Sequence, residues 1–287
     1  MSEVPFPPPG SCDCHVHVIG PKSRFPLLPN RIYTPKDAVT SELRSILQRL
    51  GVERTVIVQP SIYGTDNSCT LDAVDEIGAS ARAVAVLPPD TKGSTLDDLH
   101  RRGVRGLRVN VATAPTGIEA VRRQLADAAG LTVRNGWHVQ IFATPDAIDA
   151  LAGELLALPV PVVIDHFGLI APDSDAVTRA GTLIRLLTTG KVWVKLSAPY
   201  RIADDPHDPC IVPLARALAD ANPERVVWGS DWPHTPPHPG GPITDHEEPY
   251  RDLDTRAMLH VTRTWLPDAR MQSRLLVENP AKLYGFH

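Results

Sequence analysis

The feature that most constrains the fold of this chain is a regular recurrence of short, β-branched runs separated by longer amphipathic stretches. Between the runs, apolar residues recur at three- and four-residue spacing, as at Leu43, Leu47 and Leu50. This alternation is typical of βα units that build a parallel sheet. The eight predicted strands cover residues 13–19, 55–59, 83–87, 106–110, 138–142, 162–166, 192–196 and 226–230.

The number of runs favours a closed barrel. Gly51, Gly103, Gly136 and Gly190 each follow a predicted helix, where a left-handed C-cap favours glycine before the next strand. No GxGxxG motif follows the first strand, as an open dinucleotide-binding sheet would require. The chain has 287 residues, and a (β/α)8 barrel typically uses about 250. We therefore predict an α/β protein with a (β/α)8 TIM barrel, in one domain over residues 1–287.

Composition excludes several classes of partner. The formal net charge is -4 and no long basic run is present, so neither nucleic acid nor an anionic membrane is expected as a partner. The longest apolar runs, such as 160–164, are far shorter than the roughly 20 residues that cross a bilayer. Residues 1–10 lack the pattern of a secretory signal, and the four cysteines show no CxxC spacing. We predict a cytoplasmic protein that acts on small molecules, with its oligomeric state left open.

Polar residues stand at the ends of three predicted strands. His15 and His17 lie on the first strand, where the two-residue period places both side chains on the same side. His166 ends the sixth strand and Asp231 follows the eighth. The carboxyl ends of barrel strands converge on one face, so we expect these four side chains to meet there.

Three imidazoles and one carboxylate can bind a divalent metal, or they can orient a water and polarise a carbonyl without one. Either arrangement supports hydrolysis. The His-x-His pair alone could equally be a buried, hydrogen-bonded pair of structural histidines. Its combination with His166 and Asp231 predicts an active site. Cys12 and Cys14 could be ligands or redox thiols, but we interpret them as small core residues that alternate with the two histidines.

Four motifs together resemble the amidohydrolase superfamily, and within it the branch of pyrone lactonases: CDCHVHV, VIDHFG, WGSDWPH and ENPAKLYGF. The resemblance covers essentially the whole chain. It implies that His15, His17 and His166 polarise a carbonyl or bind a metal, and that Asp231 deprotonates the attacking water. Strand four ends in Arg108, where binuclear relatives carry a bridging lysine, and strand five offers Gln140 in place of a histidine. The resemblance therefore implies at most one divalent metal, zinc or manganese, or none.

The resemblance also implies an anionic substrate, because the lactonase pocket residues have counterparts in Tyr33, Ser61, Arg108 and Arg201. Arginine presents a planar, permanently charged fork to a carboxylate, and the two hydroxyls can donate to the same group. The alternative for each arginine is a structural ion pair. His234, three residues after Asp231 on a predicted rim loop over 233–249, is a further candidate for substrate binding.

Two departures from the lactonase pattern change the expected substrate. Leu169 stands where an arginine is expected, and residues 109–115 lack a second arginine. Fewer cations weaken the recognition of a dicarboxylate, so we predict an anionic lactone with a single carboxylate, a sulfonate or a sugar-acid ring.

Two other functions remain open from the sequence. The first is a zinc-dependent decarboxylase on the same scaffold, although Cys14 and Val18 do not supply the acidic residue expected near the first histidine pair. The second is a noncatalytic barrel that binds a carboxylated metabolite. A carboxylate such as Asp231 beside an anionic ligand costs affinity, so its presence favours catalysis. Release of carbon dioxide would identify the decarboxylase, and turnover of any lactone would exclude the binding protein.

Overall fold

Eight parallel strands form one sheet in the sequential order β1 to β8. The computed structural model describes residues 5–112, 117–236 and 246–286. Each predicted strand is confirmed, with ends that differ by a few residues. The strands are β1 (Cys12–Val16), β2 (Arg54–Val58), β3 (Ala81–Ala85), β4 (Val104–Asn110), β5 (His138–Phe142), β6 (Val162–Ile164), β7 (Val192–Ser197) and β8 (Val226–Gly229).

The seam between β1 and β8 brings the two ends of the sheet together. The backbone N–H of Asp231 donates to the carbonyl of His15 at 2.8 Å, and the N–H of His17 donates to the carbonyl of Trp232 at 2.8 Å. The sheet thus curls into a (β/α)8 TIM barrel, as predicted. Because the seam is built from the segments that carry His15, His17 and Asp231, barrel closure itself brings these residues together.

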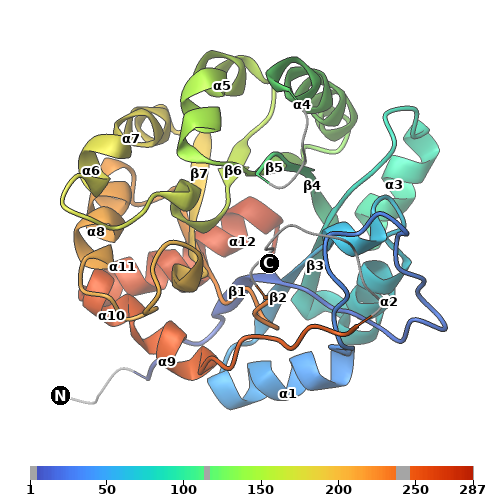
Figure 1. The fold of residues 1–287 in the computed structure, drawn as a ribbon, viewed down its shortest axis with the longest axis horizontal. Coiled ribbons are helices and arrows are strands. Elements are labelled where there is room, and N and C mark those ends of the chain that lie inside the picture. Colours follow the sequence, from blue (N-terminus) through green and yellow to red (C-terminus); the bar gives the residue numbers. More distant parts are fainter. Residues whose placement is uncertain (1–4, 113–116, 237–245, 287) are drawn as a thin grey trace.

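Most helices surround the strands, and in Figure 1 these form an outer ring around the central sheet, while α12 lies across its centre. They are α1 (Thr40–Leu50), α2 (Ser68–Ile77), α3 (Gly93–Arg101), α4 (Ile118–Val133), α5 (Pro145–Ala157), α6 (Ala176–Arg179), α7 (Gly181–Thr188), α8 (Ile211–Ala221), α9 (Thr255–His260), α10 (Thr262–Trp265), α11 (Ala269–Ser273) and α12 (Asn279–Tyr284). Among the described helices, none combines the length and apolarity that a membrane span requires. Residues 237–245 of the predicted rim loop lie outside the described residues.

Helix α1 illustrates how the sequence sets these elements. It buries Leu43, Leu47 and Leu50, whose three- and four-residue spacing puts them on one face. The Glu42 side chain accepts a hydrogen bond from the N–H of Val39 at 3.1 Å, which satisfies a donor at the helix start. Gly51 ends the helix in a left-handed conformation with φ 70°. The glycines predicted after three other helices also have positive φ, which confirms their role as helix ends: Gly103, Gly136 and Gly190.

An apolar cluster fills one end of the barrel interior, the end at which the strands begin. Its members come from β1, β2, β3, β6, β7 and β8, and side chains of so many strands can touch only inside the barrel. Tyr284 and Phe286 of the C-terminal segment pack on the same cluster. We call this set the lower cluster, and its strand residues are Cys12, Cys14, Val56, Val58, Val84, Val163, Trp193 and Val227.

The two cysteines of β1 are buried free thiols, as predicted. Their strict alternation with the histidines is not observed, because Cys12 and Cys14 face the barrel interior with the lower cluster. The register of β1 against β2 shifts between Asp13 and Val16. Such an irregularity re-aims side chains along the strand. It lets Cys14 pack below while His15 reaches the site above.

Candidate active site

The backbone carrying the candidate catalytic residues is strained. Asp231 has φ 61° and His166 has φ 50°, a left-handed conformation that non-glycine residues rarely adopt. Asp13 holds the seam below them, because its Oδ1 accepts from the N–H of His15 at 3.2 Å and of Ser230 at 2.9 Å. A side chain at Gly229 would come within 2.6 Å of Cβ of His15. The fold therefore tolerates strain and close backbone approach where it positions Asp231, as functional sites commonly do.

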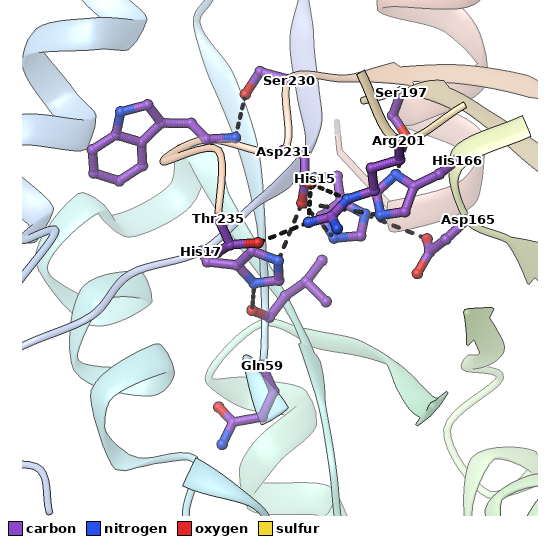
Figure 2. Close-up of polar contacts among 12 residues, drawn as sticks. His15, His17, Gln59, Asp165, His166, Ser197, Arg201, Ser230, Asp231 and Thr235 are labelled. Carbon is purple, nitrogen blue, oxygen red and sulfur yellow. Dashed lines mark hydrogen bonds and ion pairs between the residues drawn. The ribbon is translucent and has the colours of Figure 1, made fainter. Parts of the chain in front are cut away.

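Three imidazoles converge on one oxygen of Asp231 (Figure 2). Oδ1 of Asp231 lies 3.3 Å from Nε2 of His17, 3.5 Å from Nε2 of His15 and 4.0 Å from Nε2 of His166. All four side chains are almost completely buried. Oδ1 nevertheless has no hydrogen-bond partner among the described residues. The structure thus brings together the four residues that the sequence singled out and leaves one carboxylate oxygen available among them.

The second oxygen of Asp231 is fully engaged. Nε of Arg201 donates to Oδ2 at 2.7 Å, and the hydroxyl of Tyr200 donates to the same oxygen at 2.6 Å. Burial acts to raise the pKa of Asp231, but the guanidinium of Arg201 outweighs it and holds the pKa well below its usual range. Asp231 is therefore ionised at neutral pH, with the orientation of its carboxylate fixed from one side.

The other ring nitrogens of His17 and His166 are also held. Nδ1 of His17 lies 2.7 Å from the carbonyl of Val58, which can only accept, so His17 carries its hydrogen on Nδ1 and turns the lone pair of Nε2 toward Asp231. Nδ1 of His166 lies 2.8 Å from the hydroxyl of Ser197. Burial lowers the pKa of His166 to about 3. His166 is thus neutral at physiological pH.

The same atoms fit a divalent cation. Two sets of potential ligand atoms each lie within 4.8 Å of one another: His15, His17 and Asp231 form one, and His15, Asp165 and His166 form the other. The lone pair of His17 faces an ionised carboxylate oxygen without a hydrogen bond, and this unfavourable contact is relieved by a cation or a water between them. Imidazole and carboxylate are ligands that zinc accepts. The residues present therefore suit one metal ion.

A small cavity lies beside His17, and most of the predicted substrate-binding residues line it. His17, Tyr33, Ser61, Arg108 and Arg201 all line it. Its volume is about 20 Å³, which is the space for a water rather than for a lactone. Both arginine side chains are largely buried, 8% exposed for Arg108 and 13% for Arg201. Entry of a ring substrate therefore requires some of these side chains to move.

His234 takes a different place from the one predicted. It is buried next to the site, but its Nε2 pairs with the hydroxyl of Thr255 at 2.9 Å and its ring lies edge-on to Tyr200. It lines a separate cavity of about 610 Å³ between α1 and residues 250–255. A role for His234 in substrate binding stays a prediction.

Sequence reasoning gave no site role to several residues that contact the site, which include Asp13, Asp165, Lys195, Ser197 and Tyr200. Lys195 is buried in β7 and lies 3.2 Å from Nδ1 of His15. The sequence could have drawn attention to Lys195, because a lone lysine interrupts the apolar strand VWVKLS. Tyr200 directly precedes Arg201, and no pattern in the sequence marks it as a partner of Asp231.

The geometry defines a class of protein: a parallel (β/α)8 barrel that gathers three imidazoles and a carboxylate where its strands end. Comparison with known families agrees. The amidohydrolase family model matches residues 12–286. The chain therefore belongs to the amidohydrolase family, as its motifs indicated.

Curated relatives and a solved structure extend the comparison. The chain is 34% identical to a 4-sulfomuconolactone hydrolase of Rhizobium radiobacter, over 97% of this chain and 91% of that protein. It is 34% identical to a 2-pyrone-4,6-dicarboxylate hydrolase of Comamonas testosteroni, over 96% and 90% of the two chains. The crystal structure of a putative 2-pyrone-4,6-dicarboxylic acid hydrolase from Pseudomonas putida superposes with a TM-score of 0.79 at 29% identity, covering 97% and 98% of the chains.

Proposed function

We propose that this enzyme hydrolyses an anionic lactone, with Asp231 as the general base. One observation carries the proposal: Oδ1 of Asp231 faces three imidazole Nε2 atoms within 4.0 Å and lies beside a cavity lined by Arg108 and Arg201. The relatives named above, which act on a sulfomuconolactone and on a pyrone dicarboxylate, support a charged ring ester as the substrate class.

The proposed reaction adds one water across the ring ester. Oδ1 of Asp231 accepts a proton from the water, and the water oxygen bonds to the carbonyl carbon while the carbonyl electron pair moves onto its oxygen. An Nε2–H of His15 or His166 would donate to the resulting oxyanion, because Nε2 of His17 presents a lone pair. The ring C–O bond then breaks as the carbonyl re-forms, and Asp231 returns the proton to the leaving alkoxide. The product is a ring-opened hydroxy acid.

Arg108 and Arg201 supply the charge recognition. Arg201 binds Asp231 in this structure, so a substrate carboxylate or sulfonate competes with Asp231 for the same guanidinium. Transfer of Arg201 to the substrate would free Oδ2 and raise the pKa of Asp231 from its depressed value, which makes it a stronger base. In this proposal, the anionic group of the substrate helps to activate the base that attacks its ring. Arg108 of β4, with Tyr33 from the segment after β1 and Ser61 from the segment after β2, would bind the same end of the substrate.

A metal ion enters the proposal as one resident cofactor at most. His15, His17, His166 and Asp231 would hold a single zinc or manganese, which when bound supplies Lewis-acid polarisation of the carbonyl or the water. Strand β4 carries Arg108 and β5 carries Gln140 at the positions discussed above, and neither is a ligand for a second ion.

Buried free cysteines support the cytoplasmic location expected from the sequence.

A lactone panel tests this function directly. The purified protein is offered carboxylated, sulfonated and neutral lactones in weak buffer, and acid release is followed together with the mass of the product in ¹⁸O-water. We expect acid release from a charged lactone and one solvent oxygen in the product. Release of carbon dioxide without ring opening would instead identify the decarboxylase. Metal analysis and prolonged chelation of the same preparation determine whether activity depends on an ion, and two tightly bound ions per active chain would contradict the single-ion proposal.

A further inference from the structure

A long loop between β1 and α1 forms one wall of the small cavity. Residues 17–39, all of which the structure describes, make this connection without a helix or strand of their own. Two buried residues anchor the loop, Phe25 and Ala38. Between these anchors, residues 26–37 contribute Ile32 and Tyr33 to the cavity wall. We call residues 26–37 the flap. Loops of this length are uncommon in compact domains, and many of them serve as lids over active sites.

The base of the flap is firmly built. Ile19 and Ala38 exchange backbone hydrogen bonds at 2.9 and 2.7 Å. The ring of Phe25 packs on Gly20, because a Cβ at that glycine would lie 2.4 Å from Cδ2 of Phe25. The two anchors are thus held close together by neighbouring residues. The flap can therefore rotate about this base without disturbing the core.

The body of the flap is braced by Arg31. Its Nε donates to Oγ1 of Thr34 at 2.7 Å, and its Nη1 donates to the carbonyl of Leu28 at 3.2 Å. The backbone N–H of Arg31 donates to the same carbonyl at 3.3 Å. These bonds connect the two halves of the flap to each other, so it can move as one body.

Two backbone hydrogen bonds fasten the flap to segments on either side of it, and we call them the latches. In the first, the N–H of Leu28 donates to the carbonyl of Ile62 at 2.8 Å. In the second, the N–H of Glu248 donates to the carbonyl of Thr34 at 2.8 Å. Water can replace both partners when the flap lifts, so each latch contributes only modestly to the closed position.

Other walls of the cavity belong to the barrel itself. Arg108 lies in β4 and Phe142 in β5, and these two strands pair along their length. Ser61 and Arg201 lie in short 3-10 helices that follow β2 and β7. The cavity holds about 20 Å³, whereas ligand pockets usually measure about 300 Å³ or more. Displacement of the strands would break sheet hydrogen bonds, so the flap is the wall that can give way to a ring.

We propose that the flap lifts from Ile62 and from residues 246–250 to admit the lactone, and then closes with Ile32 and Tyr33 over the bound ring. This inference rests on the proposed function, because it takes a ring lactone as the ligand. Closure brings the hydroxyl of Tyr33 to the substrate and keeps bulk water away from Asp231. A flap that cannot lift therefore excludes the substrate.

Hydrogen exchange measures the opening without any substrate. Exchange of ¹⁵N-labelled wild type is followed by NMR at the two latch amides, those of Leu28 and Glu248. The reference is the amide of Val194, which donates to the carbonyl of Arg225 within the barrel at 2.9 Å. We expect similar protection factors for the two latch amides, at least about 100-fold below that of Val194, because the flap opens without unfolding the barrel.

A disulfide across one latch tests whether this opening admits the substrate. Pro35 and Glu248 are bridge partners on parallel segments, and such partners lie about 4.8 Å apart, within the reach of a disulfide. Pro35→Cys/Glu248→Cys is made in a Cys210→Ser background, because Cys210 is an exposed thiol. We expect oxidation to lower kcat/KM on the best lactone at least about 10-fold and to raise the protection factor of the Leu28 amide. Reduction should restore both.

Ile19→Cys/Ala38→Cys in the same background is the matched control. These residues form an antiparallel pair at the base of the flap, and a pair of this kind has a Cα separation of about 5.5 Å. The control disulfide joins the two ends of the loop and leaves the flap free to lift. Its oxidation should change kcat/KM and the latch protection factors by less than about twofold.

Two results would overturn the inference: latch amides as well protected as Val194 in the wild type, or an oxidised Pro35→Cys/Glu248→Cys enzyme that keeps the kcat/KM of its reduced form. The wild-type exchange data decide the first point even if the double variant does not fold. Exchange does not depend on turnover, so a wild type whose latches open but that hydrolyses no lactone would contradict the proposed function alone.

Discussion

The two ends of the barrel interior are built from the same strands and differ in nearly every physical respect. The lower cluster is apolar, with valines, two cysteines and Trp193 packed against Tyr284 and Phe286. The upper end, where the strands end, holds ionised and imidazole side chains and left-handed backbone at His166 and Asp231. The lower end thus stabilises the barrel, while the upper end gives up part of that stability to place reactive groups. Substitutions at the two ends should therefore separate stability from activity.

The largest expected effect is at the upper end. Asp231→Asn keeps the volume but removes the proposed base, and loss of a general base costs about 100- to 10,000-fold in rate. Initial rates on the best lactone measure the loss, and circular dichroism checks that the fold is retained. Asp204→Asn, at an exposed site, is the control and should be fully active. An Asp231→Asn enzyme with a third of wild-type activity would place the base elsewhere.

A smaller effect is expected from the substrate-binding arginine. Arg108→Met keeps an unbranched apolar stem and removes the charge, which should cost about 2 kcal/mol in kcat/KM on a charged lactone, or roughly 30-fold. Arg185→Met on α7 is the surface control. If kcat/KM for charged and neutral lactones falls equally in Arg108→Met, Arg108 does not recognise the charge.

The lower end should show the reverse behaviour. Val163→Ala removes two buried methylene equivalents from the lower cluster and should lower the free energy of unfolding by about 1.5 kcal/mol, with kcat within about twofold of wild type. Val177→Ala, at a side chain 40% exposed, is the matched control and should cost far less. Urea unfolding and initial rates measure both quantities. A large loss of kcat in Val163→Ala would show that the two ends are not separable.

The smallest expected effect is that of pH on the free enzyme. Burial lowers the pKa of His166 to about 3, so this ring stays neutral as the pH falls from 8 to 5. The pKa of Asp231 also lies well below its usual range, so its carboxylate stays ionised over the same interval. We expect kcat/KM to be nearly constant between pH 8 and 5, as measured with a substrate that does not titrate there. A fall with an apparent pKa near 6.5 would contradict the neutral, buried His166.

Much of this architecture could be predicted from the sequence because it depends on short-range patterns. All eight strands, the glycine helix ends and the meeting of His15, His17, His166 and Asp231 follow from periodicity and from the convergence of strand ends. Contacts that depend on register could not be predicted in this way. The irregularity in β1 turned Cys14 toward the interior, against the expected alternation.

The contacts made by residues behind the site could not be predicted either, although the lone lysine of VWVKLS stands out in its strand. Lys195 lies in the middle of its strand rather than at its end, and its contact with His15 spans 180 residues of chain. Tyr200 reaches Asp231 only because the segment after β7 turns through Ala198 in a left-handed conformation with φ 48°. Such contacts depend on the packing of distant segments, which no local pattern encodes.

The central claim is that the upper end of the barrel opens a charged lactone with Asp231 as the base. The most direct test compares one carboxylated lactone with its neutral methyl ester, using wild type and Asp231→Asn under the same conditions. The account predicts that wild type opens the carboxylated ring with kcat/KM at least about 30-fold above that for the ester, a difference of about 2 kcal/mol. It also predicts that Asp231→Asn opens neither. Equal rates on the two lactones, or ring opening by Asp231→Asn near the wild-type rate, would contradict it.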